Sequence, residues 1–211
     1  MKNQFIEIPA SKFSLSRRKL IYGVGVNDAD YMTNMVSPDG NNIACPYYQK
    51  WVDIIQRTHS EKYLIRYPTY RDCTICDEWL KFSKFKSWMI KQDWEGKCLD
   101  KDVIKPGNKH YSPKYCAFVS QHVNLILTTR KRHRGSLPVG VHKNKRGFAA
   151  IVSVNGKYVK LGTYGTKEGA SKAYGAAKHD AIIDLASKQS NPRVRRGLEL
   201  HAMKYLNCEV E

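Results

Sequence analysis

Hydrophobic and polar positions alternate in the C-terminal third of the chain as they do in β-strands. Three alternating runs cover residues 139–146, 147–154 and 157–162. Asn155-Gly156 separates the last two runs and favours a tight hairpin, because both residues tolerate positive φ. Thr166 then precedes a helical pattern with Glu168 in its first turn, as expected of a helix N-cap. The pattern predicts three antiparallel strands packed on one helix.

The first half of the chain has the spacing of helices instead. Pro46 suits a first helical position. Two hydrophobic stripes with helical spacing follow: Tyr47, Trp51, Ile54 and Ile55, and then Trp79, Phe82, Phe85 and Met89. Such stripes usually form core, so we expect a helical core between residues 45 and 94. Before it, the arm over residues 1–42 has one alternating run, at 19–26, which predicts an extended segment.

The charge of the chain indicates its partner. The 211 residues include 36 Lys+Arg and 19 Asp+Glu, a formal charge of +17, and residues 128–211 alone carry 17 basic and 6 acidic side chains. This balance favours a polyanionic partner such as nucleic acid. No apolar run reaches the roughly 18 residues of a membrane span, and the N-terminus lacks the apolar region of a signal peptide. We expect a cytoplasmic protein with no membrane partner.

The densest basic cluster marks the expected domain boundary. Residues 129–136 contain Arg130, Lys131, Arg132 and Arg134 and almost no apolar side chain, which is typical of an exposed linker that can lie along phosphates. We therefore expect an N-terminal module with its arm over residues 1–127 and a basic linker over 128–136. A sheet-and-helix domain over 137–190 and a basic tail over 191–211, with room for one short helix, complete the expected organisation.

The C-terminal domain resembles a known DNA-binding family. Its matching positions include Gly140-Val141, Gly147, Ala149-Ala150, Leu161-Gly162-Thr163-Tyr164, Thr166, Glu168, Ala170, Ala173-Tyr174 and Ala176-Ala177. Over residues 137–185 this pattern resembles the Apetala2/ethylene-response-factor DNA-binding domain. The resemblance implies a three-stranded antiparallel sheet that packs on one helix and reads the major groove through strand side chains.

The resemblance also implies which side chains contact DNA. His142 and Asn144 stand where the plant domains carry base-reading arginines, and Phe148 and Lys160 replace two family tryptophans. The plant sequence specificity therefore does not transfer. The DNA-binding candidates of the domain are His142, Lys143, Asn144, Lys145, Arg146, Phe148, Lys157 and Lys160, and the linker adds Arg130, Lys131, Arg132 and Arg134.

The segment before the linker resembles a nuclease family. Leu99-Asp100-Lys101-Asp102, Gly107-Asn108, Tyr111-Ser112-Pro113, Phe118-Val119-Ser120 and Asn124 are similar to the pattern of phage-type HNH homing endonucleases, over residues 73–127. An Apetala2-like domain beside such a module is characteristic of mobile phage or bacterial nucleases, which implies a bacterial host cell. In that family a β-hairpin and a helix (the ββα-metal module) hold one divalent metal against the scissile phosphate.

The resemblance implies metal ligands but leaves the general base open. Asp100 and Asp102 supply hard carboxylate oxygens, and Asn124 falls at the family's last metal-ligand position, so Mg²⁺ or Mn²⁺ is the expected metal. The family histidine aligns with Asp100 or Lys101, and Tyr115 stands at the central asparagine. Two alternatives follow. Either His110 or His122 acts as the general base, or the nuclease module is degenerate and has lost its activity.

Cys73 and Cys76 form a lone C-x-x-C pair. This spacing suits half of a tetrahedral zinc site, but no second pair of this kind follows. Buried thiols are therefore the favoured interpretation over structural zinc.

These observations combine into one hypothesis of fold and function. We expect an α+β protein in which an HNH-like module precedes a small three-stranded sheet packed on one helix. The expected activity is hydrolysis of DNA phosphodiester bonds, with double-stranded DNA as the partner and no small-molecule substrate. The alternative is a non-catalytic DNA-binding or regulatory protein with a degenerate nuclease module.

Overall fold

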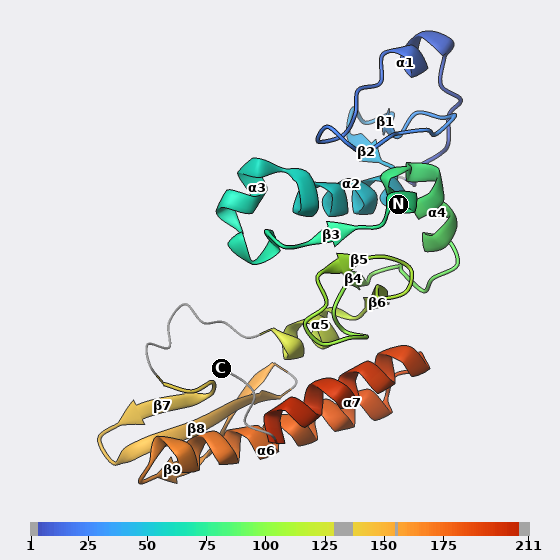
Figure 1. The fold of residues 1–211 in the computed structure, drawn as a ribbon. Coiled ribbons are helices and arrows are strands. Elements are labelled where there is room, and N and C mark those ends of the chain that lie inside the picture. Colours follow the sequence, from blue (N-terminus) through green and yellow to red (C-terminus); the bar gives the residue numbers. More distant parts are fainter. Residues whose placement is uncertain (1–3, 129–136, 155, 207–211) are drawn as a thin grey trace. The chain divides into compact units, whose positions relative to one another are not determined.

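The computed structural model describes residues 4–128, 137–154 and 156–206 and is mixed α+β with small sheets (Figure 1). The chain divides into two compact units. The first unit comprises residues 1–95 and 108–116, and the second comprises 96–107 and 117–211. The division therefore differs from the expected boundary at 128–136, because two segments before that boundary belong to the second unit.

The first unit is mainly helical. Its elements are α1 (Lys12–Ser16), β1 (Asn34–Val36), β2 (Asn42–Ala44), α2 (Pro46–His59), α3 (Glu61–Arg66), η1 (Pro68–Tyr70), β3 (Thr74–Ile75), η2 (Asp77–Leu80), α4 (Phe82–Met89) and β5 (His110–Tyr111). β1 and β2 form an antiparallel pair, and β3 pairs with β5 in parallel. The expected extended run at 19–26 is instead a tight turn: Tyr22 and Gly23 have φ of 49° and 79°, and Ile21 bridges to Gly25.

Both predicted hydrophobic stripes of the first unit form core. Pro46 opens α2, and Trp51, Ile54 and Ile55 are buried along it, whereas Tyr47 is half-buried against Trp94. The second stripe begins in η2 and continues along α4, and all four of its members are buried. The expectation of a helical core in this region is confirmed.

In its described residues, the second unit combines two sheets with three helices. Its elements are β4 (Cys98–Asp100), β6 (Ala117–Val119), α5 (Gln121–Leu127), β7 (Val141–Asn144), β8 (Gly147–Val154), β9 (Lys157–Tyr164), α6 (Lys167–Ser187) and α7 (Pro192–Leu206). β4 pairs antiparallel with β6, and β7, β8 and β9 form an antiparallel sheet in chain order. The three predicted C-terminal strands are therefore present.

The start of α6 follows the predicted N-cap. The Thr166 side chain accepts the backbone N–H of Gly169 at 3.1 Å, and Glu168 lies in the first turn. Val141, Ala150 and Val152 of the sheet pack against Ala170 and Tyr174 of this helix. The N-terminal half of α6 thus covers one face of the three-stranded sheet.

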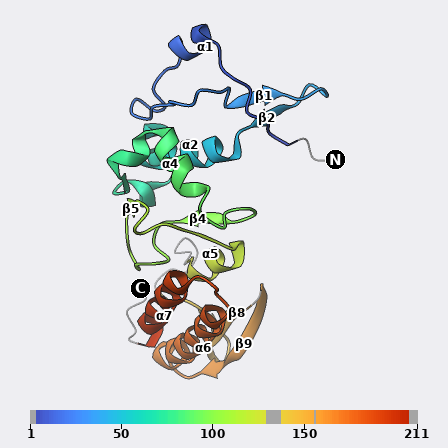
Figure 2. The ribbon, with the colours of Figure 1, turned by 90° about the vertical axis from the view of Figure 1, so that its right-hand side faces the viewer.

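The C-terminal half of α6 belongs to another core. Ile182 and Ala186 pack with Val194, Leu198 and Ala202 of α7, and the same core includes Val103, Ala117, Val119, Val123 and Ile126. In Figure 2, α6 lies between α7 and the strands β8 and β9. This shared core explains the domain division, because residues 98–107 and 117–127 bury their apolar side chains on α6 and α7.

The expected short tail helix is the 15-residue α7. It approaches α6 closely at Gly175, where an added Cβ would lie 2.5 Å from the carbonyl oxygen of Tyr205. None of the helices in the described parts of the chain is both long and apolar enough to cross a membrane.

Candidate nucleic-acid interface and acidic loop

The face of the three-stranded sheet opposite α6 is the first candidate site. Side chains on directly paired residues point to the same face of a sheet. Val141 and Ala150 face α6, so the next residues along their strands, His142 and Ala149, face away together with their partner Thr163. We call this side the outer face. It carries the His142, Asn144, Ala149, Ile151, Ser153, Tyr158, Lys160 and Thr163 side chains.

A β-bulge brings two polar side chains of β9 to the outer face. Lys160 pairs with Ile151, but Gly162 pairs with the adjacent Ala150, so Leu161 is an extra residue on β9. The bulge changes the alternation, and Lys160 and Thr163 therefore share a face although they are three residues apart. Asn144 lies beside Thr163 on the same face, and its Nδ2 donates to Thr163 Oγ1 at 3.4 Å.

Two further candidates form the turn at the end of the sheet. Lys145 and Arg146 connect β7 to β8, and both side chains are exposed. Asn144 Oδ1 accepts the backbone N–H of Arg146 at 2.8 Å and so closes the turn. Gly147, with φ of 129°, takes a conformation that other residues rarely adopt. The two cations are thus held at the tip of a short hairpin.

The structure separates the remaining DNA-binding candidates from this face. Lys143 pairs with Phe148, and Lys157 pairs with Val154, all on the side of the sheet that faces α6. Of the predicted strand residues, His142, Asn144 and Lys160 share the outer face. The linker candidates Arg130, Lys131, Arg132 and Arg134 lie outside the described residues.

The second candidate site is the loop that follows β4. Asp100 Oδ1 accepts the backbone N–H groups of Asp102 at 2.8 Å and of Val103 at 2.7 Å. Burial and the neighbouring Asp102 carboxylate raise the pKa of Asp100 to about 6. Lys101 Nζ lies 3.5 Å from Asp102 Oδ2. The predicted carboxylates are therefore close together, and they repel one another at neutral pH.

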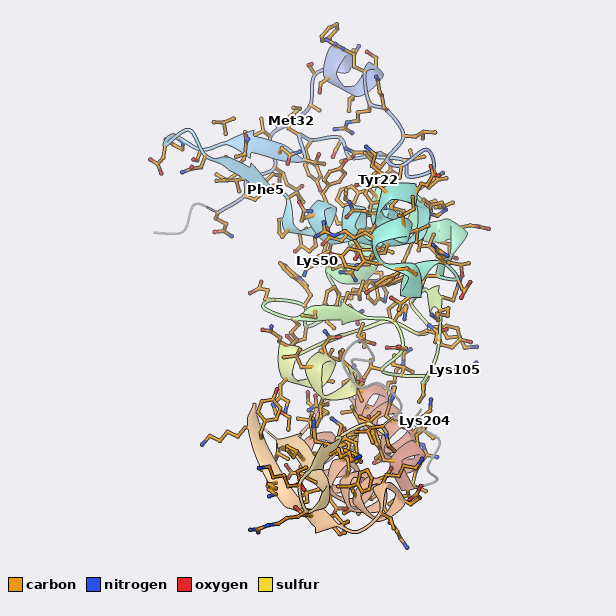
Figure 3. All side chains as sticks on the ribbon, turned by 90° about the vertical axis from the view of Figure 1, so that its left-hand side faces the viewer. Phe5, Tyr22, Met32, Lys50, Lys105 and Lys204 are labelled. Carbon is orange, nitrogen blue, oxygen red and sulfur yellow. The ribbon has the colours of Figure 1, made fainter. Side chains whose placement is uncertain are left out.

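Helix α7 supports this acidic loop. His201 Nε2 lies 2.9 Å from the carbonyl oxygen of Asp102, and because a carbonyl only accepts, Nε2 carries the proton. Burial lowers the pKa of His201, which favours the neutral ring. A Cβ added to Gly197 would overlap the carbonyl oxygen of Val103. Figure 3 labels Lys105 in the loop and Lys204 on the helix. The sequence offered no signal for His201, because its partner is 99 residues away along the chain.

The predicted helix-borne residues point in different directions. α5 contacts both β4 and β6, so Asn124 belongs to a strand–strand–helix arrangement with Asp100. His122 lies two residues before Asn124, about 200° around the helix, and lines a cavity with Leu125 and Ile126. His110 belongs to the first unit, where its Nδ1 lies 2.8 Å from Thr74 Oγ1. Within the second unit, His122 thus lies on a different side of α5 from Asn124.

The cysteine pair flanks the short strand β3. Cys73 is buried, Cys76 is half-buried, and burial raises the pKa of the Cys76 thiol. The described residues contain no group of three or more His, Cys, Asp or Glu side chains placed to hold a metal. Cys73 and Cys76 alone do not make a tetrahedral zinc site.

Comparisons with known proteins add nothing to this description. No protein-family model, curated protein or solved structure matches the chain. The functional argument therefore depends on the residues and their geometry.

Proposed function

We propose that the protein binds double-stranded DNA through the outer face of β7, β8 and β9. The observation that carries this proposal is the common orientation of Asn144, Lys160 and Thr163 on a sheet face that α6 does not cover. An antiparallel ribbon fits a major groove, where amide, hydroxyl and ammonium groups reach base edges and phosphates. Lys145 and Arg146 at the hairpin tip add two exposed cations for phosphate contact.

Charge supports the same partner. Residues 128–211 carry a formal charge of +11, and this segment contains the whole three-stranded sheet. If about six phosphates are neutralised, log K falls against log[salt] with a slope of about −5. A titration of labelled duplex followed by fluorescence anisotropy between 50 and 300 mM KCl tests this directly. A slope near zero contradicts the proposal.

We further propose metal-dependent hydrolysis of DNA at the acidic loop. The donor types suit a hard divalent cation, because Asp100 and Asp102 present two mutually repelling carboxylates and Asn124 belongs to α5, a helix that contacts β4. Bound Mg²⁺ or Mn²⁺ would offset charge that develops on the phosphate. Asp100 holds the loop through two backbone amides, while Asp102 is more open to solvent.

Binding without cleavage is the second candidate function. It is favoured by His122, which lies on a different side of α5 from Asn124 and lines the cavity with Leu125 and Ile126. Incubation of the protein with supercoiled plasmid and Mg²⁺ or Mn²⁺ separates the candidates. Cleavage that is abolished in Asp102→Ala, with duplex affinity retained, supports the nuclease. Tight binding with intact plasmid supports the non-catalytic protein.

A further inference from the structure

The second unit contains a cavity of about 590 Å³. Leu125 and Ile126 of α5 line it, together with Ile151 of β8 and Tyr174 of α6. A volume of this size lies within the range of small-molecule and cofactor sites, roughly 300–1,000 Å³. The cavity is therefore large enough for a ligand with an aromatic ring.

The cavity exists because β7 is shorter than β8. The first residue of β7, Val141, pairs with Ala150, and the last backbone bond on that side joins Ile151 N–H to the Gly140 carbonyl oxygen at 2.9 Å. β8 continues to Val154, and within the described residues no strand lies beside it on that edge. Gly140, with φ of 73°, lies so close to the Tyr174 ring that a Cβ there would overlap it. The gap beside β8 is thus bounded by this glycine, α5 and α6.

One charged side chain in the cavity wall makes no ion pair within the described residues. Lys178 is only 6% exposed, and no ion pair joins it to a carboxylate in the described parts of the chain. Its Nζ lies 6.0 Å from the centroid of the Tyr205 ring. Lys178 is one of the residues that line the cavity.

A buried ammonium group without a partner is costly unless a ligand supplies an acceptor. Burial lowers the pKa of Lys178. The position belongs to the buried row of α6, four residues after Tyr174 and four before Ile182. Packing would favour an apolar side chain there, so the lysine indicates an anionic or acceptor-rich ligand.

The cavity is continuous with the outer face of the sheet. His142, Ile151, Ser153 and Tyr158 line the cavity and also belong to that face. Tyr158 is 84% exposed, which leaves its ring available for stacking. A ligand that lies on the outer face can therefore extend into the cavity.

We propose that the cavity receives one nucleotide, with its base against the apolar wall and an acceptor oxygen or phosphate at Lys178. The inference rests on the proposed DNA binding, which brings nucleotides to this face. A base has a flat apolar face and acceptor atoms on its edge, and the cavity pairs apolar and aromatic walls with a buried cation and two histidines, His122 and His142. The nucleotide has two sources: an unpaired residue of the bound duplex, or a free deoxynucleoside monophosphate.

The test compares two labelled duplexes of the same sequence context. One contains a 2-aminopurine opposite thymine, and the other contains it opposite an abasic site, so that the base is free to leave the stack. We expect the wild-type protein to bind the second duplex about ten-fold more tightly. Lys178→Met should remove this preference and keep the affinity for the paired duplex. Lys172→Met, an exposed lysine of the same helix, is the matched control and should change neither value.

A second variant and a second ligand complete the design. Tyr158→Ala removes an exposed ring, so it leaves the core intact if Lys178→Met alters folding, and it should reduce the preference several-fold. If dGMP displaces the labelled duplex from the wild type but not from Lys178→Met, a free nucleotide is one source. If only the unlabelled duplex with its base opposite an abasic site displaces the labelled duplex, the source is the unpaired residue.

The outcomes separate the two proposals. Equal affinity for both duplexes, with no competition by dGMP, overturns the nucleotide cavity and leaves DNA binding standing. Failure to bind either duplex overturns the proposed function. In that case dGMP binding that requires Lys178 supports the nucleotide site in the cavity. The absence of dGMP binding overturns that site as well.

Discussion

The two units of the molecule are stabilised by side chains of opposite kinds. The first unit contains all four tryptophans, and Trp51, Trp79, Phe82 and Phe85 are at most 1% exposed. Their rings contact one another in tilted and edge-to-face pairs, such as Trp79 and Phe85 with centroids 5.1 Å apart. Large aromatic surface, in well-defined ring geometry, fills this core.

The second unit has no tryptophan and depends on small residues. Its cores contain Val, Ile, Leu and Ala together with Tyr174, and backbone approaches too close for an added Cβ occur at Gly147, Gly175 and Gly197. We therefore expect the stability of the first unit to fall most when a large side chain is removed. We expect the stability of the second unit to fall most when a side chain is added. The difference also concerns function, because the second unit carries the outer face, the acidic loop and the cavity.

The largest effect is expected from Trp51→Ala in the first unit. The change removes a fully buried indole and leaves the Trp79 carbonyl oxygen, which accepts from Trp51 Nε1 at 2.7 Å, without its donor. We expect a loss of about 4–5 kcal/mol in the free energy of unfolding. Urea titration followed by tryptophan fluorescence measures it, since all remaining tryptophans report on this unit.

The matched control for this variant is Trp94→Ala. Trp94 is half-buried and contacts Tyr47, so its removal should cost less than half as much. Equal losses in the two variants would contradict the importance we assign to the aromatic core.

Gly197→Ala should have the next largest effect, in the second unit. The new methyl group would overlap the Val103 carbonyl oxygen, and neither backbone can move away freely. We expect a loss of about 3 kcal/mol. Far-ultraviolet circular dichroism in urea measures it. Gly169→Ala is the control, because its nearest contact is the Thr166 hydroxyl at 3.3 Å, and it should change stability by less than about 1 kcal/mol.

Asp100→Asn should stabilise the protein at neutral pH. The folded-state pKa of Asp100, about 6, lies above its ordinary 3.8, so the folded protein binds this proton more tightly. The favourable contribution is therefore present below about pH 4 and is lost as the pH rises through 6. At pH 7.5 the neutral amide should raise stability by up to about 3 kcal/mol, and flatten its decrease between pH 4 and 6.

Thermal melting at several pH values checks this prediction. Asp180→Asn changes an exposed carboxylate on α6 and serves as the control, with little expected change. A wild-type melting temperature that rises from pH 4 to 6 in step with Asp100 ionisation would contradict the assigned pKa. Mn²⁺ should raise the melting temperature of the wild type more than that of Asp100→Asn, because the cation needs the carboxylate.

The smallest effect, and the most direct on function, is expected from Lys160→Ala. Lys160 lies on the outer face, whereas Lys157 of the same strand lies on the side that faces α6. Lys160→Ala should weaken duplex binding about five-fold at 100 mM salt and reduce the salt slope by about 1. Lys157→Ala has the same charge change and should have a smaller effect on both. Equal effects measured by anisotropy would contradict the assignment of the outer face.

Several features of the fold could be predicted because they depend on local spacing. The strands β8 and β9 follow from alternation and the Asn155-Gly156 signal, and the start of α6 follows from Thr166. The aromatic core followed from helical spacing in α2 and α4. In each case neighbouring residues along the chain contain the whole signal.

The candidate site could be predicted only in part. The sequence placed Lys160 and Asn144 in strands, but it could not show that a bulge at Leu161 aligns Lys160 with Thr163 on one face. His122 and Asn124 are two residues apart in the sequence, yet helix geometry turns His122 towards the cavity. The direction of a side chain is a property of register and packing rather than of residue order.

The sequence by itself determined the local elements, the charge and the residue types available for chemistry. Only the tertiary structure decided how those elements are divided between cores. Residues 98–107 and 117–127 pack on α6 and α7, because the single long helix α6 has one end in each core of the second unit. The tertiary structure also decided the partners of Lys178 and His201, which contact Tyr205 and the Asp102 carbonyl oxygen far along the chain. Contacts of this kind depend on which apolar surfaces find one another, and no local pattern encodes that choice.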